Sequence, residues 1–382
     1  MIIVWSNDFK NMVQKISTCV YKGKKGITEY KTVRIIAKDN KIYMQSCKPI
    51  ESMNNMVLTI CEDAEVYDAE DFRIAYKDLE KISKIKCDEI SIRVENHMAV
   101  FICGKKKVTF MTYAWDEEWG LPENKDIEKL MAMDAHMFSD IFNTLEKFTS
   151  KGEFQKVMNG IYLNLAKSRM ESMDGHRIAL REIEADIQLE NNINIPSSIA
   201  PVIKKCIGKN IEKIIVEKDG DYAILSGKDF KLCVKQIEGD YFNVDKMIDF
   251  DSFQRAVFNT KEVVDVMEFD SKSNKYESAY VDAKKKKTST KIESKPVILS
   301  VENDNVNFKL ITPEIKVEDE ICVKDSSLHD GFRIGFNPEF CLDALNTFDD
   351  EEFEGKFGKN SIAPMILSAN NWTHVVLPIS IE

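Results

Sequence analysis

The chain has 382 residues, of which 43% are hydrophobic and 31% are charged, and its formal net charge is −11 at pH 7. This composition excludes a disordered or fibrous chain, and the length exceeds one ordinary core, which predicts two to four domains. The acidic total does not exclude a nucleic-acid partner, because screening limits the reach of each charge to ~8 Å at physiological ionic strength.

The first predicted element is a helix that begins near Ser6. Ser6, Asn7 and Asp8 offer capping side chains, and the apolar residues after them recur at the spacing of one helical face. These residues are Phe9, Met12, Val13, Ile16 and Cys19. Residues 33–46 alternate and contain turn signals, which predicts an antiparallel hairpin. A second helix around Leu79, Ile82 and Ile85 and further strands over residues 88–113 complete the first third.

The same order returns twice, at separations of about 125 residues, whereas a solenoid repeats every ~20–50 residues. The first helix reappears at Phe138, Ile141, Phe142, Leu145 and Phe148, and more weakly at Val263, Val264 and Met267. The second helix reappears at Ile199, Val202, Ile203 and Ile207, and at Phe340, Cys341, Ala344, Leu345 and Phe348. Strand-like segments follow over residues 160–183, 211–237 and 296–311. Each third is therefore helix, strands, helix, strands, which predicts an α+β fold with antiparallel sheets.

Breaks in this pattern predict three domains, at residues 1–124, 125–249 and 250–382. Linkers are expected at residues 115–126 and 241–252, with errors of several residues. In the last domain, the loop after the first helix is interpreted as a Lys-rich insertion over about residues 270–295.

Neither a membrane span nor a disulfide framework is expected. No run of about 18 apolar residues exists, and Asp8 and Lys10 interrupt the N-terminus before a secretory segment forms, so we expect a cytoplasmic protein. The nine cysteines are odd in number, scattered and never in a CxxC pair, which indicates reduced and mostly buried thiols rather than a zinc site. No cofactor or metal is expected.

Four short strings within this three-part pattern resemble the bacterial DNA sliding clamp, the beta subunit of the replicative DNA polymerase III holoenzyme. Met173-Asp174-Gly175-His176-Arg177-Ile178-Ala179 resembles the family's Thr-Asp-Gly-His-Arg-Leu-Ala, and Asn159-Gly160 matches its Asn-Gly. Gly239-Asp240-Tyr241-Phe242 resembles Gly-Arg-Phe-Pro, and Val375-Val376-Leu377-Pro378-Ile379 resembles Val-Val-Met-Pro-Met. The order and spacing of these strings, more than any one of them, carry the resemblance.

The resemblance implies a groove between the middle and last domains that binds short peptides of partner proteins. Carried over by position, it would contain Met173, Gly175, His176, Arg177, Ile178, Phe242, Lys246, Met247, Val375, Val376, Leu377, Pro378 and Ile379. Apolar Ile178, Met247, Val376 and Leu377 suit leucine or phenylalanine anchors, and the final strand suits pairing with an extended peptide. Phe242 stands where proline is usual and Lys246 where arginine is usual, so peptide preference is expected to differ.

The family's helices face DNA, and lysines lie on the side of several predicted helices that is not core. Lys77, Lys81 and Lys84 fall at i, i+4 and i+7. The other candidates are Lys10, Lys15, Lys22, Lys24, Lys25, Lys151, Lys204, Lys205, Lys284, Lys285, Lys286 and Lys287. Their contacts would be directed at phosphates and blind to sequence. A solvated helix face, and for Lys284 to Lys287 a disordered surface loop, are the alternatives.

The family reading implies a non-catalytic processivity factor that encircles duplex DNA. Two chains would form a head-to-tail homodimeric ring of six repeats, with Val108, Met267 and Phe269 as candidates for the dimer interface, although Val108 fits a core strand position equally well. Its partners would be double-stranded DNA, the polymerase, the clamp loader and other proteins that carry clamp-binding peptides. Two alternatives stay open: a hydrolase built around Asp174 and His176, which lacks a nucleophile motif, and a repeat scaffold that does not act on DNA.

Overall fold

The computed structural model describes residues 1–23, 29–50, 54–114, 119, 126–152, 155–208, 210–249, 253–284, 295–303, 305–312, 315–358 and 362–381. These residues form two compact units. The first contains residues 1–146, 160–168 and 184–238, and the second contains residues 147–159, 169–183 and 239–382. No helix in the described ranges is long and apolar enough to cross a membrane.

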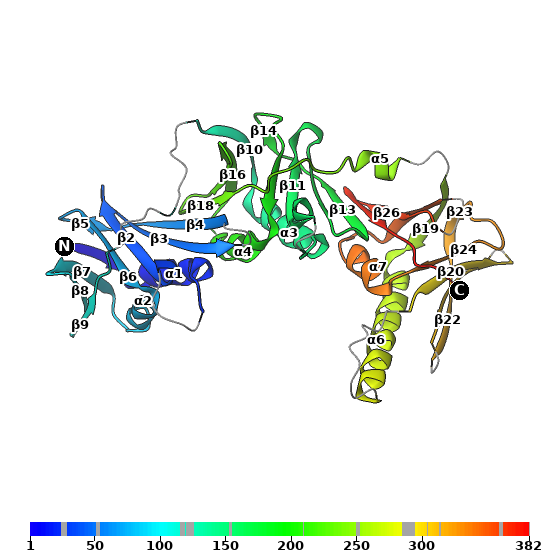
Figure 1. Cartoon of the computed structure of the whole chain (residues 1–382), viewed down its shortest axis with the longest axis horizontal. Coiled ribbons are helices and arrows are strands. Elements are labelled where there is room, and N and C mark those ends of the chain that lie inside the picture. The colour runs from blue at the N-terminus through cyan, green and yellow to red at the C-terminus, as the bar shows by residue number, and fades with distance from the viewer. Residues whose placement is uncertain are drawn as a thin grey trace. The chain divides into compact units, whose positions relative to one another are not determined.

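One order of elements occurs three times along the chain (Figure 1). The first third comprises β1 (Ile2–Trp5), α1 (Ser6–Ile16), β2 (Thr32–Lys38), β3 (Lys41–Ile50), β4 (Asn54–Asp63), β5 (Glu65–Val66), β6 (Glu70–Ala75), α2 (Tyr76–Ile82), β7 (Glu89–Glu95), β8 (Met98–Cys103) and β9 (Lys106–Met111). The second comprises β10 (Glu128–Asp134), α3 (Ala135–Leu145), β11 (Gly160–Asn164), β12 (Arg169–Met173), β13 (Arg177–Glu182), β14 (Asp186–Ile187), β15 (Ile193–Pro196), α4 (Ala200–Cys206), β16 (Lys213–Asp219), β17 (Tyr222–Ser226) and β18 (Phe230–Lys235).

After the short helix α5 (Asp245–Ile248), the order begins again at β19. This last third comprises β19 (Phe253–Asn259), α6 (Thr260–Lys284), β20 (Val297–Glu302), β21 (Asn305–Ile311), β22 (Lys316–Ile321), β23 (Val323–Ser326), β24 (Arg333–Phe336), α7 (Pro338–Leu345), β25 (Glu352–Gly358), β26 (Met365–Ala369) and β27 (Trp372–Val376). The expected α+β class with three similar parts is therefore confirmed.

The first unit is built on two antiparallel sheets. One has the order β5-β1-β7-β8-β9, and the other has the order β14-β10-β16-β17-β18-β4-β3-β2-β6. In the second of these sheets, strands of the first and middle thirds meet where β18 pairs with β4, with Phe230 opposite Ile60. A pair of strands, β11 and β15, completes this unit. Its helices α1 and α3 contact strands of these sheets and both contact α4.

The second unit joins strands of the middle and last thirds in the same way. The hairpin β12–β13 continues through β27, β26, β25 and β19 to β23, and β13 pairs with β27 so that Ile178 lies opposite Val375. A four-stranded sheet has the order β22-β21-β20-β24. Helix α6 packs on α7, β19 and β22. This unit contains all residues of the expected peptide groove.

The predicted apolar helix faces are buried because each helix covers a sheet. Phe9, Met12, Val13 and Ile16 of α1 are at most 2% exposed, and Phe138, Phe142 and Leu145 of α3 are fully buried. Asp134 caps α3, since its Oδ1 atom accepts a hydrogen bond from the Met137 backbone N–H at 2.8 Å. Burial of each of these side chains contributes roughly 1.5–3 kcal/mol to the stability of the folded protein.

Helix α6 corrects one expectation about the last third. The segment interpreted as an expanded loop from residue 270 continues the helix as far as Lys284 (Figure 1). Its residues favour this result, because 270–284 contains no glycine or proline and includes strong helix formers such as alanine, lysine and glutamate. Lys285, Lys286 and Lys287 lie outside the described residues.

Candidate functional site

The turn between β12 and β13 is held by the carboxylate of Asp174. Its Oδ1 atom accepts hydrogen bonds from the backbone N–H groups of His176 and Arg177, both at 3.0 Å, and the Asp174 N–H donates to the Arg177 carbonyl at 3.2 Å. Gly175 has a φ of 90°, a conformation in which glycine carries no steric penalty. The Asp174–Arg177 part of the family-like segment thus folds as a tight hairpin turn, and the Asp174 carboxylate has a structural role.

Arg177 ties this turn to two other segments. Its Nε atom donates to Asp174 Oδ2 at 2.9 Å, its Nη1 atom to Asp343 Oδ2 at 2.6 Å, and its Nη2 atom to the Lys147 carbonyl at 2.9 Å. The guanidinium carbon also lies 4.7 Å and 4.6 Å from the ring centroids of Phe148 and Phe340. Arg177 is 9% exposed, so it is a buried structural centre rather than a free groove side chain.

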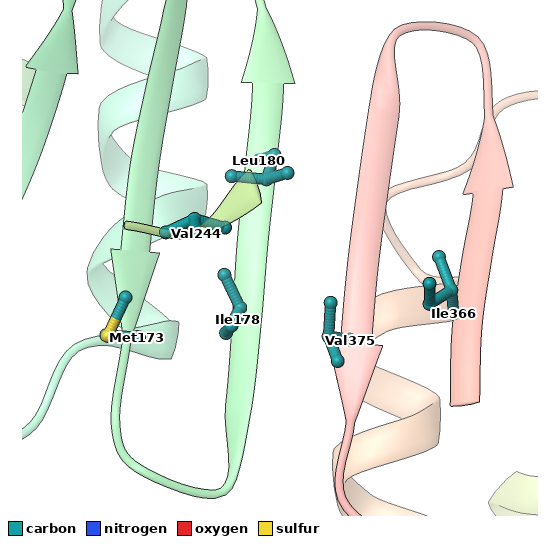
Figure 2. Packing of buried hydrophobic residues seen from close by; sticks show 6 residues of the cluster. All are labelled: Met173, Ile178, Leu180, Val244, Ile366 and Val375. Atoms are coloured by element: carbon teal, nitrogen blue, oxygen red, sulfur yellow. The ribbon is translucent and has the colours of Figure 1, made fainter. Parts of the chain in front are cut away.

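An apolar surface lies beside this turn on one face of the sheet (Figure 2). It runs across β12, β13, β27 and β26, and we name it the apolar cluster. Its buried members are Met173, Ile178, Leu180, Val244, Ile366 and Val375. Strand register explains why these residues meet: Met173 lies opposite Ile178, Ile178 opposite Val375, and Val375 opposite Ile366.

The apolar cluster has a partial cover made by the segment around α5. Met158, Tyr241, Phe242 and Ile248 are partly buried against the cluster. One ion pair, from Arg169 of β12 to Asp245, holds the start of α5 to that strand, and a second ion pair within β12 orients the Arg169 side chain. Arg169 bonds Glu171 through Nε at 2.6 Å and Asp245 through Nη1 at 2.9 Å.

Most of the expected groove residues come together here, with one correction. Val376 follows Val375 on a strand, so its side chain lies on the opposite face of the sheet from the apolar cluster, where it is 1% exposed. Met247 is 36% exposed and is not part of the cluster, whereas its neighbour Ile248 packs against it. Lys246 is exposed on α5.

The rim of the cluster is formed by His176 and the chain after β27. The Leu377 N–H donates to the His176 carbonyl at 2.9 Å, and Leu377 is 43% exposed. The Ile379 backbone N–H donates to the Gly335 carbonyl at 2.8 Å. Pro378, between Leu377 and Ile379 in the sequence, is half-buried. The His176 ring stacks on Phe340, with centroids 5.9 Å apart.

Several members of this site were not predicted. Leu180 could have been found, because it lies two residues beyond Ile178 on the same strand face. Phe340 and Asp343 belong to α7, where the spacing of Phe340 indicates only the apolar stripe of the helix and Asp343 belongs to no recognisable motif. Val244 and Ile366 required knowledge of which strands pair, and no local pattern in the sequence supplies it.

A cleft between α1 and α2 brings together three of the DNA-facing candidates in the first unit, Lys10, Lys84 and Lys205. The cleft has a volume of about 930 Å³ and is lined by four lysines, Lys10, Lys84, Lys86 and Lys205. Lys10, Lys77 and Lys204 are exposed as expected, and so is Lys22 after α1. Lys151, which is also exposed, lies in the second unit. Lys24 and Lys25 lie outside the described residues.

Three of the candidate lysines have acidic partners. Lys15 forms an ion pair of 2.5 Å with Asp229, and its side chain is 14% exposed. Lys81 pairs with Asp78 at 2.7 Å, and Lys84, which follows the end of α2, pairs with Glu80 at 3.1 Å. The latter two remain 64% and 70% exposed, so solvent still reaches their charge. Of these three lysines, Lys15 is the most buried.

The candidate interface residues differ in exposure. Phe269 on α6 is 56% exposed, and Val108 is half-buried on β9, an edge strand of its sheet. Met267 is 3% exposed and lines the core of the last third with Phe258 and Phe336, which corrects its assignment as a candidate for the dimer interface. The helical spacing explains this, because Met267 lies on the same face as Val263.

No cluster of three or more metal-ligating side chains occurs among the residues that the structure describes. The same described residues place the Asp174 carboxylate on backbone N–H groups and on Arg177, while the His176 ring stacks on Phe340. This arrangement gives no support to a hydrolase built around that pair.

Comparison with known proteins gives consistent results. The family model of the DNA polymerase III beta subunit, C-terminal domain, matches residues 284–380. The beta sliding clamp of Bacillus subtilis (strain 168) is 21% identical over 355 residues, which cover 91% of this chain and 88% of that relative. The structure of the DNA polymerase sliding clamp from Bacillus subtilis has a TM-score of 0.84 at 17% identity, over 100% of this chain and 99% of that one.

The structure of DNA polymerase III subunit beta from Pseudomonas aeruginosa also has a TM-score of 0.84, at 13% identity and over 100% of both chains. At such identities the likeness in structure shows a shared fold. Residues 284–380 therefore match the C-terminal domain of the DNA polymerase III beta subunit, and the chain as a whole is similar in sequence and in fold to bacterial DNA sliding clamps.

Proposed function

We propose that the chain acts as a DNA sliding clamp, a ring-shaped homodimer that encircles duplex DNA and tethers the replicative polymerase. The observation that carries this proposal is the threefold order of nine strands and two helices, because two such chains supply the six repeats of a closed ring. The boundaries of the three domains, near residues 124 and 249, belong to the same proposal. Processivity follows from topology, since a closed ring needs only weak contacts with the duplex.

The inner surface of the ring is proposed to carry the exposed lysines that lie on α1, α2 and α4 or directly after them. Lys10, Lys84 and Lys205 converge on one cleft, which supports phosphate contacts without base reading. Lys284 and the three lysines after it would add to these contacts. Because the chain is acidic in total, the effect depends on local placement of charge.

The apolar cluster and its rim are proposed to bind short peptides of the polymerase, the clamp loader and other partners. Buried apolar side chains beside exposed Leu377 and His176 suit leucine or phenylalanine anchors. Phe242 covers part of the cluster, so a bound peptide would compete with its ring. This competition supports a peptide preference that differs from that of clamps with proline at this position.

The test of ring function uses topology rather than affinity. The protein is loaded onto nicked circular plasmid by a bacterial clamp loader and separated from free protein by gel filtration. We expect it to stay with the circle and to be released when a restriction enzyme linearises the plasmid. Equal retention on circular and linear DNA would contradict the ring, and sedimentation velocity would independently report whether the chain is a dimer.

A further inference from the structure

We infer that Asp343 and Phe340 of α7 are positioning residues for the proposed peptide groove: through the guanidinium of Arg177 they hold the Asp174–Arg177 turn, and with it the groove rim, against that helix. This inference rests on the proposed function of the groove. It gives Arg177 a different role from that of a residue that contacts the peptide.

The contacts of Arg177 leave little of its side chain for a ligand. Its Nε, Nη1 and Nη2 atoms each donate to a different residue, namely Asp174, Asp343 and the Lys147 carbonyl, at 2.9, 2.6 and 2.9 Å. A guanidinium presents its donors in a rigid planar fork, so these three bonds together fix its orientation. With 9% of the residue exposed, Arg177 is enclosed by its own chain.

Two phenyl rings complete this enclosure. The guanidinium carbon lies 4.7 Å from the centroid of Phe148 and 4.6 Å from that of Phe340, distances at which a cation is attracted to an aromatic face. Phe340 also stacks with the His176 ring. Helix α7 thus touches both residues at the end of the turn, Arg177 through Asp343 and Phe340, and His176 through Phe340.

The same turn sets the geometry of the groove. The backbone carbonyl of His176 accepts a hydrogen bond from the Leu377 N–H at 2.9 Å. Ile178, the residue after Arg177, is a member of the apolar cluster and lies opposite Val375. A shift of Arg177 would therefore move an exposed rim residue and a buried floor residue together. Contacts made by α7 are transmitted to the peptide site without touching the peptide.

The experiment measures binding of a fluorescein-labelled octapeptide with leucine and phenylalanine anchors by fluorescence anisotropy. Asp343→Asn keeps the shape of the side chain and removes its charge, and Phe340→Leu removes the aromatic face. Each is expected to weaken binding roughly three- to tenfold. Asp349→Asn is the matched control, because Asp349 is exposed just beyond α7. We expect that control to stay within about twofold.

Three further readouts separate positioning from general stability. Asp343→Glu, which keeps the charge, should recover binding to within about threefold. In a protein that already carries Arg177→Ala, adding Asp343→Asn should weaken binding by no more than about twofold, because both substitutions remove the same interaction between Arg177 and Asp343. Amide hydrogen exchange of residues 174–178 should be faster in Asp343→Asn than in Asp349→Asn, while the melting temperatures stay within about 2 °C.

Binding that is insensitive to Asp343→Asn, or losses that multiply in the double variant, would refute the inference and leave the groove intact. A fall in melting temperature that accounts for the loss of affinity would reduce α7 to a structural support and would also refute it. If the wild-type chain does not bind the probe, the groove itself is refuted, and with it any residue that positions it.

Discussion

The Nε2 atom of His374 lies 2.7 Å from the hydroxyl oxygen of Thr347, which connects strand β27 to the residues that end α7. That hydroxyl donates its hydrogen to the Ala344 carbonyl at 2.7 Å, so Nε2 carries the proton and donates to it. His374 is fully buried, and burial, followed by the charge of Arg177, lowers its pKa to about 3. The ring is therefore neutral in the folded protein.

This burial predicts a loss of stability in mild acid. An unfolded histidine takes up a proton below about pH 6.5, whereas folded His374 does not do so until about pH 3. The contribution of His374 to the free energy of unfolding is therefore complete above pH 6.5 and decreases as the pH falls below that value. We expect the free energy of unfolding to fall by up to about 1.4 kcal/mol per pH unit between 6.5 and 5. Urea unfolding at pH 7.5, 6.5 and 5.5 measures this slope. His374→Gln should flatten it, whereas the same change at exposed His329 should not.

Asp270 predicts the opposite dependence on pH. It is 1% exposed on α6, and neither carboxylate oxygen has a hydrogen-bond partner among the described residues. Burial, and then the charge of Asp319 on β22, raise its pKa to about 7. The unfolded carboxyl ionises near pH 3.8, so the stability of the protonated folded form is lost as pH rises from 3.8 to about 7.

The substitution Asp270→Asn removes this penalty at high pH. Its melting temperature should exceed that of the wild type by several degrees at pH 8, and the difference should nearly vanish at pH 4. Asp265→Asn, at an exposed position of the same helix, is the control. An equal shift at both values of pH would mean that the Asp270 carboxyl is already ionised in the folded protein at pH 4.

The threefold order of elements could be predicted because most of its helices have a strong local signature, the first helix of the last third being the weaker case. Phe138, Phe142 and Leu145 are spaced for one face, and all three are fully buried as that spacing predicts. Strand pairing was not accessible in the same way. The approach of Val375 to Ile178 and Ile366 depends on which strands meet across the two thirds, and residues far apart in sequence decide it.

The candidate site shows the same division between local and distant information. The turn at Asp174–Arg177 could be recognised from its own residues, since Gly175 and Asp174 are typical turn formers. The role of Arg177 could not, because Asp343 lies 166 residues away along the chain. Met267 and Val376 were misassigned because a helical or strand position alone does not say which neighbour covers it.

The cysteines predict selective reactivity. Burial raises the pKa of Cys19 to about 11 and of Cys206 and Cys341 to about 12, so these thiols stay protonated at neutral pH. Cys322 is the exposed cysteine of the chain. Brief treatment of the native protein with iodoacetamide at pH 7.5, followed by mass spectrometry, should label Cys322 first. Labelling of Cys341 at a comparable rate would show that the core around α7 opens readily.

Phe269 is a candidate for self-association, because this aromatic residue is 56% exposed on α6, beside the core residue Met267. Burial of such a side chain against a second chain contributes roughly 25 cal/mol per Å² of apolar area, and a carboxylate there would have to be desolvated without a partner. Phe269→Asp is therefore expected to weaken dimerisation by about tenfold or more in sedimentation velocity.

Ile362→Asp is the matched control, because Ile362 is 80% exposed on the connection between β25 and β26, away from both candidate interface positions in sequence. The control should leave the dimer unchanged. If both variants dissociate equally, added negative charge on an already acidic chain explains the effect, and Phe269 is no interface residue. If neither does, closure of the ring must depend on other surfaces, of which the edge strand β9 with Val108 is the next to test.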